Sequence, residues 1–355
     1  MWGLFACALV AKQWDDVEEF PILVDPDFVE PAPLNGILRV LTWNIKFGGG
    51  RTDFFWDGWG DENRIDSMEV ERNLEAVAAL LAEIDADVVL LQEVDVDSRR
   101  TSHVDESDWL LTHTPYNYAA WVPNWDVNYA PEEGLGEVTM GNVILAKHEL
   151  TRNTRIDQPQ SESQSALVNW FYLHRAIQVS EVVLPDVGPV ALLNVHPDAY
   201  SSDGTKELHL EQIFDVAADS PEPLVLGGDF NEVPPGSLKL KDFEDEAPTL
   251  AGAGVSVVEY TEEETLWMMP FFDTWATETP LLTYQTGNLD TQSRFFSHSV
   301  SKDVLWTQKL DYQFSSFENA GGWVLQLPGD GDPPLVSVPM DLSDHCPVLA
   351  DWVLP

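Results

Sequence analysis

Apolar and polar residues alternate along this chain with two different periods, and stretches of the two kinds follow one another in order. Residues 37–44 form an apolar run that ends in the polar Asn44, which predicts a buried strand. Between Asp66 and Ile84 the apolar residues recur at helical spacing, and Asp66 is a suitable N-cap. Residues 87–93 form a second buried strand that ends in a carboxylate. A strand, a helix and a strand in this order are typical of an α/β fold.

Similar apolar runs continue to the end of the chain. They predict strands at 143–146, 176–184, 190–195, 224–226, 310–315 and 347–353, edge or hairpin strands at 323–327 and 336–338, and a helix at 204–218. Residues 109–136 are aromatic and irregular, and we expect them to form surface loops. The pattern as a whole predicts two packed sheets with helices outside.

Two stretches fall outside this pattern. Residues 15–35 are acidic and rich in proline, so we expect residues 1–35 to be a leader that precedes a domain at 36–355. The apolar residues before them are too few to span a bilayer, and no other segment is long enough. Cys7 lies in a segment similar to the lipid-attachment box of bacterial lipoproteins, while an edge strand or frayed tail is the alternative. The second stretch, at about 232–309, is an acidic insert whose short apolar pieces predict extra strands or a flap.

The charge restricts what the protein can bind. There are 61 acidic residues against 18 Lys and Arg, which gives a formal net charge of -43, while 44% hydrophobic residues suffice for a large core. Such a surface repels duplex nucleic acid and anionic membranes at low salt. We therefore expect either a working environment of high ionic strength or a small substrate bound at a local positive site. A secreted or cell-envelope location is favoured over the cytoplasm of a halophile.

Polar residues stand at the ends of the predicted strands. They are Asn44, Glu93, His196, Asp229, Asn231, Asp311, Asp344 and His345. Each has an ordinary structural alternative, such as a turn residue, a surface acid or a core histidine. Taken together they are the groups that phosphate hydrolysis needs, because oxygen donors suit Mg²⁺ and a carboxylate beside an imidazole suits proton transfer. The spacing of Cys and His does not match a zinc site, and there is neither a GK[ST] phosphate loop nor a GxSxG motif.

These residues lie in segments that resemble the endonuclease/exonuclease/phosphatase superfamily of metal-dependent phosphoesterases. The segments are LTWNIK, DVVLLQEVD, GNVIL, NVHPD, LGGDFNEVP, LDYQF and LSDHCPVLADW, in the family's order from about residue 37 onward. The resemblance implies a four-layer α/β sandwich of two packed, mainly antiparallel or mixed β-sheets flanked by helices. It also implies that Glu93 binds the metal, with Asn44 and Asp344 nearby. Mg²⁺ is the expected ion, with Mn²⁺ or Ca²⁺ as alternatives.

The resemblance further implies the catalytic roles. Asp229 would activate or position the attacking water, and Asn231 would orient the water or the phosphate. His345, held by Asp311, would stabilise the transition state or share the proton transfer, and His196 would donate to a non-bridging oxygen. One-metal and two-metal versions of this chemistry both remain open, as does the identity of the general base.

Four further residues are candidates for substrate binding. Arg99 and Arg100 stand in a chain where arginine is scarce, and we expect at least one to contact a substrate phosphate rather than a local acid. Arg175 precedes a predicted strand at a position where relatives often carry arginine. Asn142 begins a strand and is either a substrate contact or structural.

The function that follows is divalent-metal-dependent hydrolysis of a phosphate ester by direct attack of water. We expect a small or lipid-linked phosphodiester or phosphomonoester as the substrate. One alternative is a nuclease that works at high salt, although the acidic insert argues against duplex DNA at low salt. The alternative from another class is a binding module that has kept the scaffold and lost turnover. The oligomeric state is not predicted.

Overall fold

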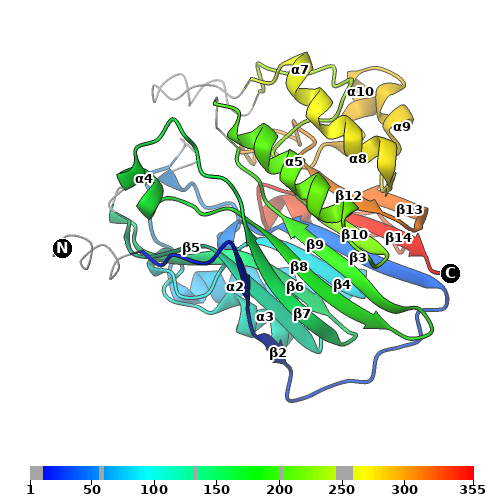
Figure 1. Ribbon diagram of the computed structural model, residues 1–355, viewed down its shortest axis with the longest axis horizontal. Helices are drawn as coiled ribbons and strands as arrows, with labels where there is room; N and C mark the ends of the chain where they lie inside the picture. Colours follow the sequence, from blue (N-terminus) through cyan, green and yellow to red (C-terminus); the bar gives the residue numbers. More distant parts are fainter. Residues whose placement is uncertain (1–10, 56–59, 131–133, 200–202, 245–258) are drawn as a thin grey trace.

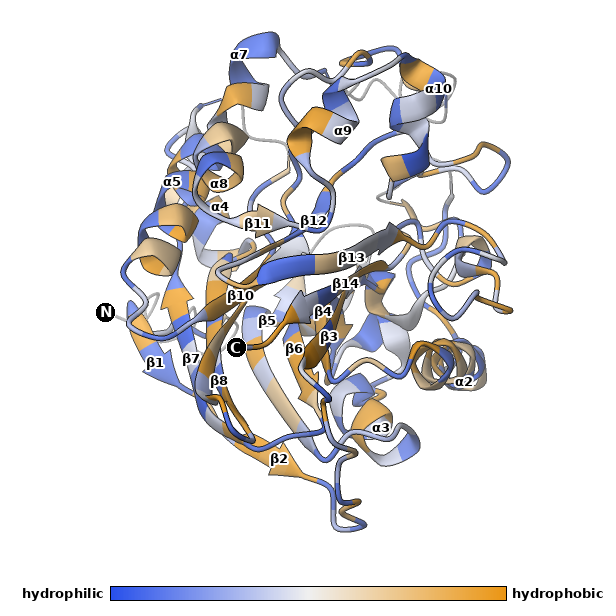
Figure 2. Cartoon of the chain, turned by 90° about the vertical axis from the view of Figure 1, so that its right-hand side faces the viewer, coloured by the Kyte–Doolittle hydropathy of each residue, from blue (hydrophilic) through white to orange (hydrophobic). Residues whose placement is uncertain are grey.

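The protein folds as a four-layer α/β sandwich. The computed structural model describes residues 11–55, 60–130, 134–199, 203–244 and 259–355. Two seven-stranded sheets pack face to face, and helices cover their outer faces (Figure 1). Apolar residues are concentrated in the strands, whereas α7 (Glu262–Thr265) at the periphery is hydrophilic (Figure 2). The fold class predicted from the sequence is confirmed.

The first sheet contains the predicted strand–helix–strand unit. Its order is β13 (Glu318–Val324), β14 (Val348–Val353), β3 (Ile37–Asn44), β4 (Val88–Asp95), β6 (Gly136–Ala146), β5 (Tyr118–Ala130) and β2 (Ile22–Val24). Only β3 and β4 pair in parallel, because α2 (Ser67–Ile84) connects them, and the other neighbours are antiparallel. The apolar faces of α2 and α3 (Glu106–His113) pack on the outer side of this sheet.

The second sheet has the order β1 (Val17–Glu19), β7 (Leu150–Asp157), β8 (Ala176–Leu184), β9 (Gly188–Val195), β10 (Leu224–Asp229), β12 (Asp311–Ser315) and β11 (Ala276–Thr277). Here β9 and β10 are the parallel pair, connected by α5 (Thr205–Ala218). The helices α5 and α8 (Met269–Thr274) cover its outer face. The remaining described helices are short: α4 (Ala166–Phe171), α9 (Leu281–Gln285), α10 (Leu289–Gln292) and the 3₁₀ helices η1 (Lys46–Gly48), η3 (Arg99–Thr101), η5 (Leu266–Met268), η6 (Ser293–Phe295) and η7 (Pro339–Asp341).

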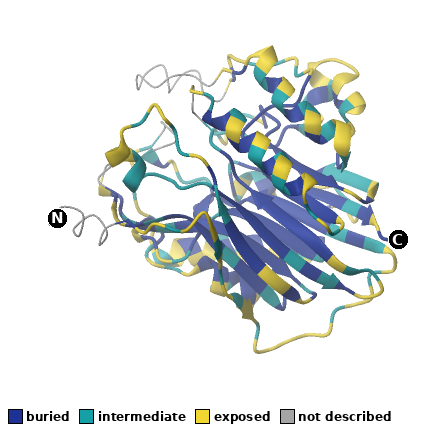
Figure 3. Ribbon diagram, viewed as in Figure 1, coloured by how far each residue is buried: buried dark blue, intermediate teal, exposed yellow. Residues whose placement is uncertain are grey.

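The two sheets are joined by an apolar core that also contains amides. Leu38, Leu90, Leu192 and Val225 belong to the apolar cluster between the sheets, and the central strands are mostly buried (Figure 3). Gln92 in β4 donates to Asn194 in β9 at 2.7 Å, and other side-chain amides there bond to the opposite sheet in the same way. Burial of an amide is tolerated only with such partners, so these contacts select one alignment of the two sheets.

The predicted elements of the core are confirmed, and some peripheral ones are wrong. Residues 109–136 are not loops, since they contain most of α3 and the long strand β5. Irregular pairing of β5 with β6 after Pro123 and after Val127 disrupts the alternation that identifies a strand. Residues 336–338 form no strand. The late strands β13 and β14 join the first sheet, beside β3.

The segment expected to be a leader without secondary structure instead supplies two edge strands. β1 pairs with β7 and β2 pairs with β5, so residues 17–24 extend both sheets. Three-residue strands give too short a pattern to recognise in a proline-rich sequence. Cys7 lies outside the described residues. No helix among the described residues has the length and apolarity that crossing a membrane requires.

Within its described residues the insert has short helices between 262 and 295 and the two-residue strand β11, and the rest, including 232–244, has no helix or strand. The apolar run 267–275, expected to be a strand or flap, forms parts of η5 and α8 because the aromatic residues lie on one side and meet the second sheet. Phe271 is buried in the cluster that contains Phe230 and Tyr312. This run is therefore part of the core, while residues 245–258 of the insert are outside the described chain.

The end of strand β10 requires a glycine at position 228. A Cβ on Gly228 would lie 2.0 Å from the backbone oxygen of Val195, whereas a Cβ on Gly227 would meet the end of the Leu90 side chain at 2.9 Å. We predict that Gly228→Ala lowers the free energy of unfolding by about 3 kcal/mol and Gly227→Ala by about 1 kcal/mol, because a side chain can move and a paired backbone cannot. Urea denaturation of both variants measures this difference, and equal losses would contradict it.

Candidate active site

The predicted polar residues gather at one edge of the two sheets. Asn44 ends β3, Glu93 lies near the end of β4, and His196 directly follows β9. Asp229 ends β10 and is paired in register with Asp311, the first residue of β12. The strands of both sheets therefore deliver side chains to a common point, as the order of the motifs suggested.

Asp229 is at the centre of this group. Its Oδ2 accepts a hydrogen bond from Nδ2 of Asn44 at 3.2 Å and lies 3.4 Å from Nε2 of His196 and 3.5 Å from Nε2 of His345. The carboxylate is buried, and burial raises the pKa of Asp229 although the nearby His345 opposes the shift. A buried carboxylate with a raised pKa is a stronger proton acceptor than an exposed one.

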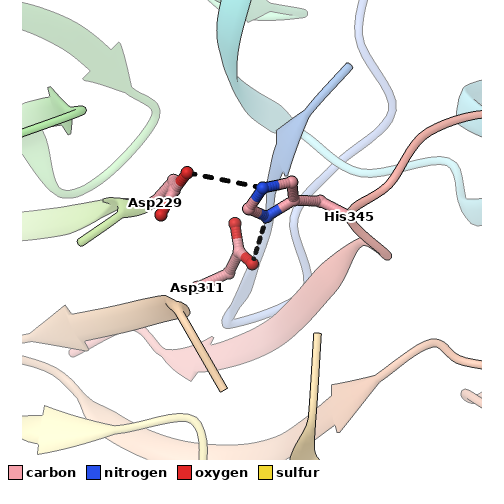
Figure 4. A group of neighbouring side chains, drawn as sticks. All are labelled: Asp229, Asp311 and His345. Atoms are coloured by element: carbon pink, nitrogen blue, oxygen red, sulfur yellow. Dashed lines mark hydrogen bonds and ion pairs between the residues drawn. The ribbon is translucent and has the colours of Figure 1, made fainter. Parts of the chain in front are cut away.

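His345 lies between two carboxylates, as Figure 4 shows. Its Nδ1 donates to Oδ2 of Asp311 at 2.8 Å, and its Nε2 faces Asp229. Burial alone would lower the pKa of His345, but the charges of Asp311 and Asp229 outweigh it and raise the pKa to about 10. The imidazole is therefore a cation at neutral pH, held in a fixed orientation by Asp311.

His196 has the opposite electrostatic character. Burial and the positive charges of Arg175 and His345 hold the pKa of His196 well below its usual range, so its ring is neutral. Asn231 lies beside it in a left-handed conformation with φ 53°. Its backbone N–H donates to Asp229 at 2.9 Å, and its side chain donates to the carbonyl of Pro197 at 3.1 Å. Asn231 thus ties the loop after β9 to the turn after β10.

Two sets of residues offer ligands for a divalent ion. The ligand atoms of Asp229, Asp311 and His345 lie within 4.8 Å of one another, but their short contacts form the hydrogen-bonded chain described above. Glu93 has φ 55° at a break in the β4–β6 pairing, and its side chain is 25% exposed. A partly exposed carboxylate suits Mg²⁺, which retains several waters, so the donor chemistry fits a metal at Glu93.

The other two predicted ligands are differently placed. Asn44 donates through Nδ2 to Glu93 at 3.2 Å, and its Oδ1 accepts the backbone N–H of Lys46 at 3.0 Å. Asp344 has its Oδ2 3.4 Å from the ammonium of Lys46. Burial opposes the charge of Asp344, but the charges of Lys46, His345 and other cations lower its pKa, so the carboxylate is ionised.

Three residues around the site were missed in the sequence. Lys46 stands two positions after Asn44, so the LTWNIK segment itself contained the signal. Arg51 donates to the carbonyls of Ser299, Ser343 and Val300, and its charge acts on Asp344. The ring of His298 lies 4.6 Å from the ring of His345. His298 comes from the insert, where no sequence pattern indicated a site.

In the described chain, the two arginines after β4 form no hydrogen bond or ion pair with this group, although the charge of Arg100 interacts with Glu93. Arg100 is 1% exposed and forms a two-point ion pair with Asp95 at 2.8 Å. Its partner is therefore a local acid. Arg99 is exposed and donates to the carbonyl of Gly134. Asn142 is fully buried and accepts from Asn124. Substrate contacts by Arg99 and Asn142 stay predictions.

Arg175 lies close to the site with part of its guanidinium unused. Its Nε and Nη1 are buried and have no hydrogen-bond partner within the described part of the chain. It lines a cavity of about 130 Å³ together with Asn169, Tyr172 and others, of which Asp198 is the only acid. Its positive charge contributes to the lowered pKa of His196.

The fold and site define a class, and comparison with known proteins agrees. The sequence profile of the Endonuclease/Exonuclease/phosphatase family matches residues 41–345, and the chain belongs to this family. Its enzymes are generally hydrolases of phosphate esters and typically depend on a divalent metal ion. No curated protein matches the sequence.

Solved structures share the fold at low sequence identity. A family protein from Beutenbergia cavernae has 20% identity and a TM-score of 0.56, covering 90% of this chain and 72% of its own. One from Bacteroides thetaiotaomicron has 13% identity and a TM-score of 0.52, covering 90% and 98%. One from Leptotrichia buccalis has 14% identity and a TM-score of 0.51, covering 88% and 98%.

The turn after Asp229 rests on a buried ion pair that makes stability depend on pH. Lys206 donates to the carbonyl of Asn231 at 3.0 Å and to Glu232 at 3.3 Å. Burial raises the pKa of Glu232 to about 7 from its ordinary 4.5, although Lys206 opposes the shift. The folded chain therefore holds a proton that the unfolded chain has released between these two values, and its free energy of unfolding falls as the pH rises through this window.

We predict that Glu232→Gln weakens this fall. The measurement is urea denaturation at a series of pH values from 4.5 to 7 at constant salt, with the wild type and variant compared. Other acids contribute equally to both proteins, so the difference between the two slopes reports Glu232. Parallel slopes would contradict the assignment.

Proposed function

We propose that this protein hydrolyses phosphate esters by direct attack of water, with a divalent metal ion at Glu93. The observation that carries the proposal is the position of Asp229. This one carboxylate lies within 3.5 Å of a neutral imidazole, a cationic imidazole and an amide. Such a set can accept a proton from water and stabilise a phosphoryl group in the same space.

The chain's own residues account for the proton and the charge. Asp229 takes one proton from the attacking water as the new oxygen–phosphorus bond forms. The cationic His345 and the neutral His196 donate to non-bridging oxygens while the bond to the leaving group breaks, and solvent protonates the leaving oxygen. A divalent ion at Glu93 supplies Lewis-acid charge to the phosphoryl oxygens when it is bound.

A small or lipid-linked phosphate ester is the substrate class that the charge supports. The net charge of -43 repels a long polyanion, whereas a small ester needs only the local positive groups. A nuclease at high salt is the alternative, because screening would remove that repulsion. The secreted or cell-envelope location and the choice of Mg²⁺ belong to this proposal.

The first test is hydrolysis of bis-p-nitrophenyl phosphate and p-nitrophenyl phosphate in Mg²⁺ or Mn²⁺. We predict that Asp229→Asn and His345→Gln each lower kcat by about 10²- to 10⁴-fold, because each removes a proton acceptor or a fixed cation. Arg72→Gln removes an exposed cation on α2 and is the matched control. Plasmid DNA and single-stranded RNA at low and high salt test the alternative. An inert wild type across metals, salts and substrates would leave only a binding module.

The second test concerns Arg175, which we propose contacts a non-bridging oxygen of the substrate. Its partnerless Nε and Nη1 support this role, because these two nitrogen atoms are inaccessible to solvent and a buried donor is costly without an acceptor. We predict that Arg175→Gln raises KM and the inhibition constant of inorganic phosphate by about 10-fold, the value of one charge-assisted hydrogen bond. Arg175→Lys should recover part of the affinity. Unchanged values in Arg175→Gln would remove the residue from the site.

A further inference from the structure

Lys46 occupies a position in the site that an ordinary loop lysine would not. It follows the end of β3, is 4% exposed, and adopts a left-handed backbone with φ 48°, followed by Phe47 with φ 43°. Two successive non-glycine residues in this region are unfavourable unless the surroundings hold them. The backbone here is held by Asn44, whose Oδ1 accepts the N–H of Lys46. The result is an ammonium directed into the site.

This one residue engages two of the three expected metal ligands. The backbone N–H of Lys46 donates to Oδ1 of Asn44. Nδ2 of the same amide is then directed at Glu93 and Asp229. Its ammonium lies 3.4 Å from Oδ2 of Asp344, and the two side chains are only 5% and 14% exposed. Glu93 is thus the one predicted metal ligand of the three that faces no lysine contact in the described chain.

The pair is held in place from both sides. Lys46 also donates to the carbonyl of Thr52 at 3.4 Å, and Ser343 donates to the carbonyl of Asn44 at 2.7 Å, which joins the β3 end to the SDH segment. A buried ammonium requires its partner, so Asp344 cannot be released at low cost. A divalent ion on the same carboxylate would have an ammonium as its neighbour, with strong repulsion in a poorly screened site.

We propose that Lys46 takes the place of a second divalent cation, so that the protein binds a single divalent ion, at Glu93. The inference rests on the proposed function and decides between its one-metal and two-metal versions. Lys46 supplies fixed positive charge on the Asp344 side of the site, next to where the phosphoryl oxygens would lie. No proton or bond changes at Lys46 in this role, since the ammonium acts only by charge and hydrogen bonding.

The test is the number of Mn²⁺ ions bound by the folded protein, independent of turnover. Equilibrium dialysis at molar KCl suppresses weak binding to the acidic surface, and Glu93→Gln defines the specific site. We predict one Glu93-dependent Mn²⁺ per chain in the wild type, with the electron paramagnetic resonance spectrum of an isolated ion. In Lys46→Asn the freed Asp344 should admit a second ion, with a spin-coupled spectrum, while the backbone N–H of residue 46 continues to donate to Asn44.

The variants are chosen to separate charge from folding. Asn tolerates the left-handed backbone, Lys46→Gln repeats the charge loss with a longer side chain, and Lys46→Arg should keep a single ion. Arg72→Gln controls for a general change in net charge. Two coupled ions in the wild type, or a single ion in folded Lys46→Asn and Lys46→Gln, would overturn the inference while leaving metal-dependent hydrolysis intact. Absence of any Glu93-dependent ion would overturn the metal requirement itself.

Discussion

The hydrogen bonds of the buried amides between the sheets are the constraint on which the rest depends. Asn194 accepts from Gln92 at 2.7 Å and donates to the carbonyls of Leu91 at 2.9 Å and Val143 at 3.0 Å, so its side chain makes three hydrogen bonds to the opposite sheet. Gln313 spans the same gap to the carbonyl of Val40 at 2.9 Å. Apolar packing alone would tolerate small slips between the sheets, but a slip here would leave amides without partners. The ends of β3 and β4 therefore meet those of β9 and β10 in one alignment, which places Glu93 opposite Asp229.

The placement of the positively charged side chains explains how so acidic a chain can bind a phosphate group. Five of its 18 lysines and arginines are buried, among them Lys309, which pairs with Glu278 at 2.7 Å, and Arg100, which pairs with Asp95 at 2.8 Å. At the site, Lys46 and the protonated His345 provide positive charge where a phosphoryl group would lie. The surface charge then acts on the choice of substrate, whereas the local charge acts on its chemistry.

The sequence was sufficient for the parts of the fold whose pattern is local. The strand ending at Asn44 and the helix capped by Asp66 follow from period and capping, and the joint order of the motifs indicated the site. It was insufficient where long-range contacts decide. Nothing local shows that residues 17–24 extend two sheets, or that the insert brings His298 against His345. Which of the two arginines pairs with a local acid could not be predicted, because the Asp95 partner of Arg100 is set by the turn after β4.

The role of a motif residue also depends on what stands beside it. Asn44 and Asp344 have the oxygen donors of metal ligands, yet Lys46 hydrogen-bonds to one and forms an ion pair with the other. Glu93 keeps partial exposure, accepts a hydrogen bond from Asn44 at 3.2 Å and lies 3.9 Å from Nε2 of His196. Residue type therefore defines which side chains at this edge of the sheets can offer an oxygen to a metal ion. The position of the buried Lys46 then determines which of these oxygens is available to the ion. The left-handed backbone after β3 places the Lys46 ammonium in the site. On this proposal, the number of metal ions bound therefore depends on this turn as well as on the carboxylates.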